Sequence, residues 1–244
     1  MSKLGHPHTT IPKLSWSDKI RLIKTMESDF KVTWNQQMEM AGQTAAEHCR
    51  TFLSKNRTKN PTALILAGHG FKAGIALTCA RRLHAWGVNV RIWNTQAPPI
   101  PSEFTQCPLQ SLQQMGVVAL AAPKNAPTLI LDGLGPHFDS EGADVESMVS
   151  WTNSQIAPVV CLEIPAGLNA DSGKPLIPHP LRANHTLSFG LPCMGLLQDA
   201  SRPFTGEVYL SDWGIPDAFW SRPHFSALSV KEGLFAEHTI LKIR

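Results

Sequence analysis

The sequence lacks the features that would place the chain in a membrane or on nucleic acid. No apolar run approaches the ~18 residues that a membrane-spanning helix needs. No run of five like charges occurs, and the net charge of +3 is too small for a strongly basic surface. We therefore expect neither a membrane nor nucleic acid among the partners, which leaves small polar or phosphorylated molecules.

Cysteine is sparse and follows no pairing pattern. The five cysteines are an odd number, lie far apart and form no C-x-x-C motif, so the sequence predicts neither a disulfide framework nor a metal site. The first residues also lack the basic-then-apolar pattern of a signal peptide. We expect a cytoplasmic protein in a reducing compartment.

The motifs of nucleophilic catalysis are missing as well. No G-x-S-x-G turn occurs, which argues against an α/β-hydrolase. Cys161 sits between apolar residues and is expected in the core, whereas Cys193 follows a proline and is expected to be more exposed. Neither cysteine has an obvious histidine partner in the sequence.

Length and composition favour one core. A chain of 244 residues with 43% hydrophobic content can form one large α/β domain. Residues 1–12 are polar and are predicted to form a flexible amino terminus. We assign residues 13–244 to a single domain.

The central stretch of the chain is residues 64–86. An apolar run at residues 64–67 predicts a buried parallel strand, and three glycines at 68, 70 and 74 predict a turn. Helical spacing follows from Ala73 to Trp86. The start of such a helix offers free N–H groups and the positive end of its dipole, so any bound anion is expected there.

This glycine pattern leaves two interpretations open. Its G-x-G-x-x-x-G spacing departs from the usual dinucleotide-binding pattern, and three glycines in a turn can serve close packing alone. The stretch is therefore either a ligand-binding turn or a purely structural one.

The remaining segments continue a strand–helix alternation. One predicted helix begins at Ser15 with Ile20, Ile23, Met26 and Phe30 on one face and Ser15 or Ser17 as its cap. Further helices are predicted at 38–53, 103–115 and 144–152, and strands at 88–93, 117–121, 128–134, 158–164, 185–190 and 207–213. The fold class is α/β: a three-layer, Rossmann-like fold with a mostly parallel sheet and helices on both faces.

In such a fold the carboxyl ends of the strands meet at one edge, where ligands bind. Asp132 and Glu163 both end apolar runs, and a buried acid without a partner costs several kcal/mol. Each acid must therefore be exposed, paired or hydrogen-bonded, and either a functional or a bracing role fits. His137, on the loop after Asp132, is either a general acid or base or an exposed histidine.

Six motifs, taken together, resemble the YjeF N-terminal domain family. They are MEMAG, GHGFKAG, LDGL, LEIPAGLNADSGKP, SFGLPCMGLL and GEVYLSDWGIP, within residues 33–219. Their order and spacing are specific, whereas any one of them alone is weak. Active members of the family are NAD(P)HX epimerases with a Rossmann-like three-layer fold, so the resemblance implies that fold and this isomerase activity as expectations.

Three loops depart from the family's pattern. In the family's glycine-rich turn, Phe71 and Lys72 stand where both asparagines are usual, and Ala73 replaces a glycine. In the V-D-I-P-S-G motif, Glu163 replaces the aspartate and Ala166 the serine. The loop GPHFDSEG lacks the family's glycines and lysine, and Cys193 stands where another lysine is usual.

The resemblance makes Glu163 the candidate catalytic residue, one methylene longer than the family's aspartate. We expect a nucleotide-like ligand with weak or lost epimerase activity, and no bound cofactor beyond an NAD(P)HX-like dinucleotide as ligand. Two alternatives stay open: an active epimerase, and a non-catalytic scaffold such as the YjeF-like domain of the enhancer of mRNA decapping. The ligand-binding candidates are Gly68, Gly70, Phe71, Lys72, Ala73, Gly74, Asp132, His137 and Ala166.

Two further expectations rest on the resemblance. Active members hold a potassium ion through residues that correspond to Lys72, Asp132 and Ala166. Because Asp132 is kept while a lysine faces it, we hypothesise that the Lys72 ammonium replaces the ion; the alternative is an exposed Lys72 and an Asp132 that braces its loop. Domains of this family often pair, so a homodimer is expected.

Overall fold

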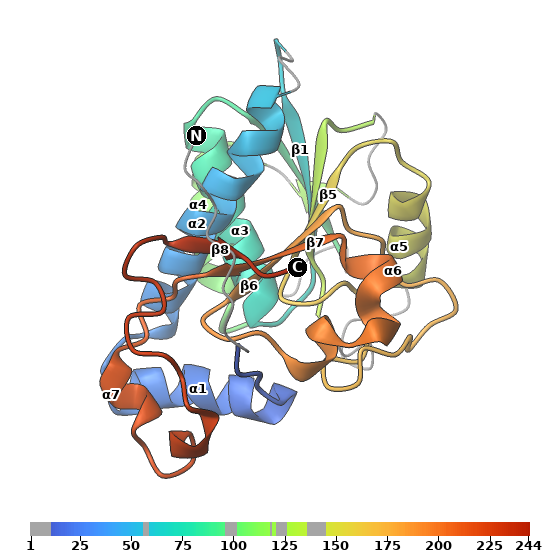
Figure 1. Cartoon of the computed structure of the whole chain (residues 1–244). Helices are drawn as coiled ribbons and strands as arrows, with labels where there is room; N and C mark the ends of the chain where they lie inside the picture. The colour runs from blue at the N-terminus through green and yellow to red at the C-terminus, as the bar shows by residue number, and fades with distance from the viewer. Residues whose placement is uncertain (1–10, 56–58, 96–101, 118, 121–125, 136–144) are drawn as a thin grey trace.

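The computed structural model describes the chain apart from residues 1–10, 56–58, 96–101, 118, 121–125 and 136–144 (Figure 1). Within the described residues, an eight-stranded sheet has the order β3-β2-β1-β4-β5-β6-β7-β8. The strands are β1 Thr62–Ala67, β2 Asn89–Asn94, β3 Ala119–Leu120, β4 Leu129–Gly133, β5 Val159–Leu162, β6 His185–Phe189, β7 Glu207–Ser211 and β8 Ile240–Lys242.

The first seven strands run parallel to their neighbours, and β8 pairs antiparallel with β7. The chain builds outward from β1 through β2 to β3 and then returns to place β4 on the other side of β1. The strand order therefore reverses between β1 and β4, and the crevice at their carboxyl ends is where such sheets bind ligands.

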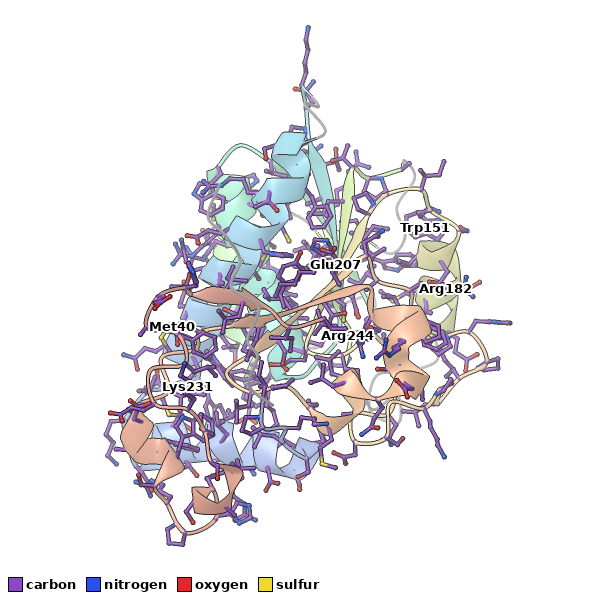
Figure 2. The ribbon with its side chains drawn as sticks, viewed as in Figure 1. Met40, Trp151, Arg182, Glu207, Lys231 and Arg244 are labelled. Atoms are coloured by element: carbon purple, nitrogen blue, oxygen red, sulfur yellow. The ribbon has the colours of Figure 1, made fainter. Side chains whose placement is uncertain are left out.

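Helices cover both faces of the sheet (Figure 1). Their bounds are α1 Trp16–Ser28, α2 Trp34–Lys55, α3 Phe71–Ala85, α4 Gln106–Gln114, α5 Val145–Asn153, α6 Arg202–Thr205 and α7 Asp217–Trp220. Figure 2 shows Met40 of α2 and Trp151 of α5 on opposite sides of the sheet. None of the helices in the described part of the chain is long and apolar enough to cross a membrane.

Strand β1 is buried on both faces, as its unbroken apolar run predicts. Ile65 belongs to the hydrophobic cluster of α2 and α3, whereas Leu64 and Leu66 belong to the cluster of α5. The α/β fold with a mostly parallel sheet is therefore confirmed. The two late strands β6 and β7 also add to one side of the sheet, as predicted.

Helix α1 is present, and of its predicted apolar face Met26 is in the core and Ile23 and Phe30 pack against it, whereas Ile20 does not. Ser15 caps it by accepting a hydrogen bond from the Asp18 N–H. The buried residues are Lys19, Leu22 and Met26, whereas Ile20 is 37% exposed. The helix lies beside α7 at one end of the sheet (Figure 1), where Leu22 and Met26 join the core while Ile20 lines a cavity.

Cys193 is a second correction, because it is fully buried. The Leu14 N–H donates to the Pro192 carbonyl at 2.9 Å, and the Met194 N–H donates to the Leu14 carbonyl at 2.8 Å. This short pairing holds the turn in place, and the Cys193 side chain packs with Ile164, Leu168 and Ala170. The domain division at residue 12 stays an expectation: residues 1–10 lie outside the described residues, and Ile11 is buried.

Candidate functional site

Helix α3 begins two residues earlier than predicted, at Phe71. Gly70 is its N-cap, with a φ of −83° and no side-chain capping bond. Lys72 is therefore the second residue of the helix. The Lys72 side chain is only 3% exposed, because it turns inward toward the ends of β4 and β5.

Lys72 forms a buried ion pair with Asp132. Its Nζ donates to Asp132 Oδ2 at 2.9 Å and to the Ile164 carbonyl at 2.8 Å, and the Cys161 Sγ lies 3.6 Å away. The Asp132 side chain is fully buried. The alternative of an exposed Lys72 is therefore excluded by the geometry.

Backbone groups complete the shell around Asp132. Its Oδ1 accepts a hydrogen bond from the Leu134 N–H at 2.9 Å, and its Oδ2 accepts one from the Ala166 N–H at 3.1 Å. Both carboxylate oxygens thus have donors within the protein. Asp132 ties the end of β4 to the loop after β5, which satisfies the rule that a buried charge must be paired and hydrogen-bonded.

Glu163 is paired with a second buried lysine, Lys19 of α1. The Lys19 Nζ lies 3.1 Å from Glu163 Oε2, with side-chain exposures of 2% and 7%. The same ammonium donates to the Leu191 carbonyl at 2.8 Å and to the Phe189 carbonyl. The acid that follows β5 is therefore paired with a buried lysine from α1, which lies far from it in the sequence.

Glu163 also accepts hydrogen bonds from strand β6, and its own backbone is strained. Ser188 Oγ donates to its Oε2 at 2.7 Å, and the Phe189 N–H donates to its Oε1 at 3.3 Å. Its φ of +62° is in the left-handed region, which costs a non-glycine residue roughly 1–2 kcal/mol. The contacts of its carboxylate must offset this strain.

The two cysteines beside the ion pairs are not activated. Burial raises the pKa of the Cys161 thiol well above its usual range, and Lys72 opposes this only in part. Burial raises the pKa of Cys193 to about 12, with Lys19 as the main opposing influence. Both remain protonated near neutral pH and are poor nucleophiles.

A cavity of about 350 Å³ lies between α1 and the start of α3. Three of its lining residues carry charges that the protein pairs or hydrogen-bonds internally: Lys19, Lys72 and Glu163. The other lining residues are mostly aromatic or aliphatic: Trp16, Ile20, Ile23, Lys24, Trp34, Gly70, Phe71, Ile75, Glu103, Phe104, Gly135 and Trp213.

The structure brings together only part of the predicted set. Gly70, Phe71, Lys72 and Glu163 line the cavity, and Asp132 lies behind Lys72. Ala73, Gly74 and Ala166 are buried, and the Gly68 N–H donates to the Gly133 carbonyl. His137 lies outside the described residues.

Gly74 has a packing role. A Cβ there would lie 2.2 Å from the Met38 Sδ and 2.7 Å from the Phe104 carbonyl oxygen, so α3 needs a residue without a side chain to approach these groups. For this glycine the structural interpretation of the turn holds. Gly70, by contrast, has open space where a Cβ would point.

Sequence reasoning missed the contribution of α1. Trp16, Lys19, Ile20 and Ile23 all line the cavity. The available signal was a lysine at position 19 inside an otherwise apolar helix face, but no local pattern shows that such a lysine has a distant acid as its partner.

Comparisons with known proteins agree with this architecture. The family model of the YjeF-related protein N-terminus matches residues 35–195. An NAD(P)H-hydrate epimerase of Bordetella pertussis (strain Tohama I) is 33% identical over 190 residues, which cover 75% of this chain and 81% of the relative. One of Lentilactobacillus buchneri is 32% identical over 156 residues, covering 62% and 72%.

The crystal structure of the yeast protein ynu0 has the same fold. It superposes with a TM-score of 0.76 and covers 96% of this chain and 100% of its own, at 21% sequence identity. The matched family model spans the turn before α3 and the ends of β4 and β5, and so includes Lys72, Asp132 and Glu163 of the two ion pairs. The chain therefore belongs to the YjeF-related N-terminal domain family.

Proposed function

We propose that this protein binds a nucleotide-like small molecule at the cavity beside Gly70 and Glu163, and that it epimerises NAD(P)H hydrates weakly or not at all. Support for the ligand class comes from relatives named NAD(P)H-hydrate epimerase at about 30% identity. Support for altered chemistry comes from three charged residues that line the cavity and are paired within the protein: Lys19, Lys72 and Glu163.

The observation that carries the proposal is the closed shell around Glu163. A general acid or base must exchange a proton with the bound molecule in a hydrogen-bonded geometry. Here both carboxylate oxygens accept hydrogen bonds from the protein, and the Lys19 ammonium lies 3.1 Å from Oε2. Freeing one partner of a buried ion pair typically costs about 3–5 kcal/mol. A cost of that size in a reaction barrier corresponds to a rate loss of roughly two to four powers of ten.

The family's cation does not fit this chain. The position between Asp132 and the Ile164 carbonyl is filled by the Lys72 ammonium, whose distances of 2.9 and 2.8 Å are those of hydrogen bonds. Ala166 supplies no side-chain oxygen. No catalytic step through a potassium ion can be assigned here.

The activity is tested by following interconversion of the two NADPH-hydrate epimers by NMR. The Bordetella pertussis relative serves as positive control and Glu163→Gln as the matched variant. We expect a rate near the uncatalysed one, with no change in the variant. Rapid interconversion that disappears in Glu163→Gln would instead establish an active epimerase.

Ligand binding is tested separately by thermal shift with NADPH and its hydrates. A ligand at a hundred times its Kd adds about 2.7 kcal/mol to the free energy of unfolding, which raises Tm measurably. No shift with any nucleotide would favour the scaffold alternative. The homodimer and the cytoplasmic location stay predictions, to be checked by analytical ultracentrifugation and by fractionation of cells.

A further inference from the structure

A second cavity, of about 190 Å³, lies just after the ends of β6 and β7. Its other wall comes from residues 230–236 of the carboxyl-terminal segment, which follows α7 and precedes β8. Trp213 is the one lining residue that it shares with the cavity beside Gly70. We propose that this second cavity binds a small organic cation of the alkylammonium class. The proposal is independent of the proposed function, because it concerns a separate cavity.

The charge of the lining favours a cation. Two carboxylates, those of Asp212 and Asp217, line the cavity with one ammonium, that of Lys231, so one negative charge is in excess. Asp212 Oδ1 accepts a hydrogen bond from the Gly214 N–H at 2.9 Å. Within the described part of the chain, none of these three charged groups belongs to an ion pair. The protein therefore leaves the excess negative charge for a ligand to neutralise.

The aromatic part of the lining adds a preference for an alkylated cation. Trp213, Trp220 and Phe235 all line the cavity. Aromatic faces attract cations, and rings around a cavity are a common means of binding quaternary ammonium groups. The Trp213 ring already has the Lys19 Nζ 5.4 Å from its centroid. We therefore assign the ligand contact to Trp220 and Phe235, which have no cation over their rings among the described residues.

The volume and the side chains disfavour other ligand classes. Sites for drug-sized molecules generally span about 300–1,000 Å³, so a cavity of about 190 Å³ has room for a headgroup with a short substituent. No group of three or more His, Cys, Asp or Glu side chains in the described residues could hold a metal ion. An anion would be repelled by the excess negative charge, and a neutral molecule would gain nothing from it.

Two probes of the same shape and different charge test the inference: choline, and 3,3-dimethylbutan-1-ol, in which a carbon atom replaces the nitrogen. Their affinities for the full chain are measured by ¹H–¹⁵N NMR titration at one ionic strength, because salt screens the attraction. We expect choline to bind at least tenfold more tightly and to shift the amide signals of Gly233 and Ala236, which line the cavity. Equal affinities, tighter binding of the alcohol, or no binding of choline would overturn the inference.

Two variants with opposite expected effects locate the site. Asp217→Asn removes a negative charge from the lining and should weaken choline binding at least threefold. Lys231→Gln removes the positive charge and should strengthen it at least twofold. Asp199→Asn is the matched control, since this exposed acid lies outside the lining and its surface pair with Arg202 contributes little to stability. Equal choline affinities of Asp217→Asn and Asp199→Asn would overturn the inference. All three positions are exposed, so the variants should fold.

A third probe identifies the source of the headgroup. Quaternary ammonium groups occur in free small molecules and in methylated lysine side chains, so a glycine tripeptide with trimethyllysine at its centre is titrated in the same way. Tighter binding of choline would identify a free ion as the ligand, and tighter binding of the peptide would identify a protein side chain. Failure of both probes would overturn the inference, whatever NADPH does at the cavity beside Gly70.

Discussion

Lys72 shows how one residue can be fully buried and still satisfied. Its ammonium has a carboxylate and a carbonyl within 3 Å, and the carboxylate has two backbone donors of its own. Burying a charge is tolerable only when such partners are in place. The whole arrangement therefore depends on each member being present.

Replacing Lys72 by methionine should destabilise the protein strongly. The substitution roughly keeps the side-chain volume but removes the ion-pair partner of the buried Asp132 and leaves it with backbone donors, so we expect the free energy of unfolding to fall by about 3–5 kcal/mol. Urea denaturation measures the change. Lys24→Met is the control, since an exposed lysine should change stability by no more than about 0.5 kcal/mol. Equal stabilities of the two variants would contradict the role of the pair.

The double variant Lys72→Met with Asp132→Asn tests the cause of that loss. Removing the charge from position 132 removes most of the desolvation penalty, so the double variant should recover part of the lost stability. If it is less stable than Lys72→Met alone, packing and not charge explains the effect.

The hypothesis that Lys72 replaces a potassium ion gives its own prediction. Exchanging sodium for potassium in the buffer should leave the Tm of this protein unchanged, because the cation position already holds an ammonium. Lys72→Asn, which carries the residue usual in the resembled family, should melt at a higher temperature in potassium than in sodium. Differential scanning calorimetry in both salts provides the measurement, and a potassium-specific shift of the unaltered protein would refute the hypothesis.

At this scale the sequence predicts one ion pair and not the other. Asp132 lies at the end of β4 and Lys72 at the start of α3 after the glycine turn, so topology brings them to one edge and makes their pairing one of the two hypotheses open from the sequence. Lys19 is on a helix far earlier in the chain, and helical periodicity treats it as a polar residue beside an apolar face. Only the tertiary packing of α1 reveals its contact with Glu163.

Among the elements, β4 and α3 approach each other at Gly133. A Cβ there would lie 2.5 Å from the Ala76 Cβ and 2.7 Å from the Leu66 carbonyl oxygen. Gly133→Ala should therefore cost about 1–3 kcal/mol, since overpacking forces backbone shifts. Gly70→Ala is the control, with no atom within 4 Å of the added Cβ and an ordinary φ of −83°. Chemical denaturation of both variants measures the difference in the free energy of unfolding. A Gly133→Ala protein as stable as the Gly70→Ala protein would show that β4 and α3 can move apart at little cost.

The elements themselves are largely predictable, because buried strands and helix faces follow simple periods. Two features are not. Strand β8 has only three residues and depends on pairing with β7, so it leaves no periodic signal. The position of Ile20 in α1 is not predicted either, because an apolar residue that lines a cavity has the same sequence pattern as one that packs in a core.

The cysteines report on the packing of the molecule as a whole. Cys49, Cys79, Cys161 and Cys193 are buried, and Cys107 is exposed. A thiol reagent such as DTNB should therefore modify one cysteine rapidly in the native protein and all five after unfolding in guanidinium. Mass spectrometry should identify Cys107 as the fast site. Rapid modification of Cys193 would contradict its burial in the cluster with Ile164, Leu168 and Ala170.

The fold of the entire molecule follows from the alternation of strands and helices, and the family follows from its ordered motifs. The chemical character of the site does not follow from either. It depends on four charged side chains from α1, α3, β4 and the end of β5, and their mutual distances exist only after folding.

Lys19 belongs to α1, which precedes the residues matched by the family model. The electrostatic character of the ligand edge is therefore set partly by a 13-residue helix on the amino-terminal side of the shared domain. A relative with another leading segment could present the same strand-end acid to solvent without any change in its sheet or turns. The charge that the sheet edge presents to a ligand is thus coupled to the packing of α1, although α1 contributes no strand to the sheet.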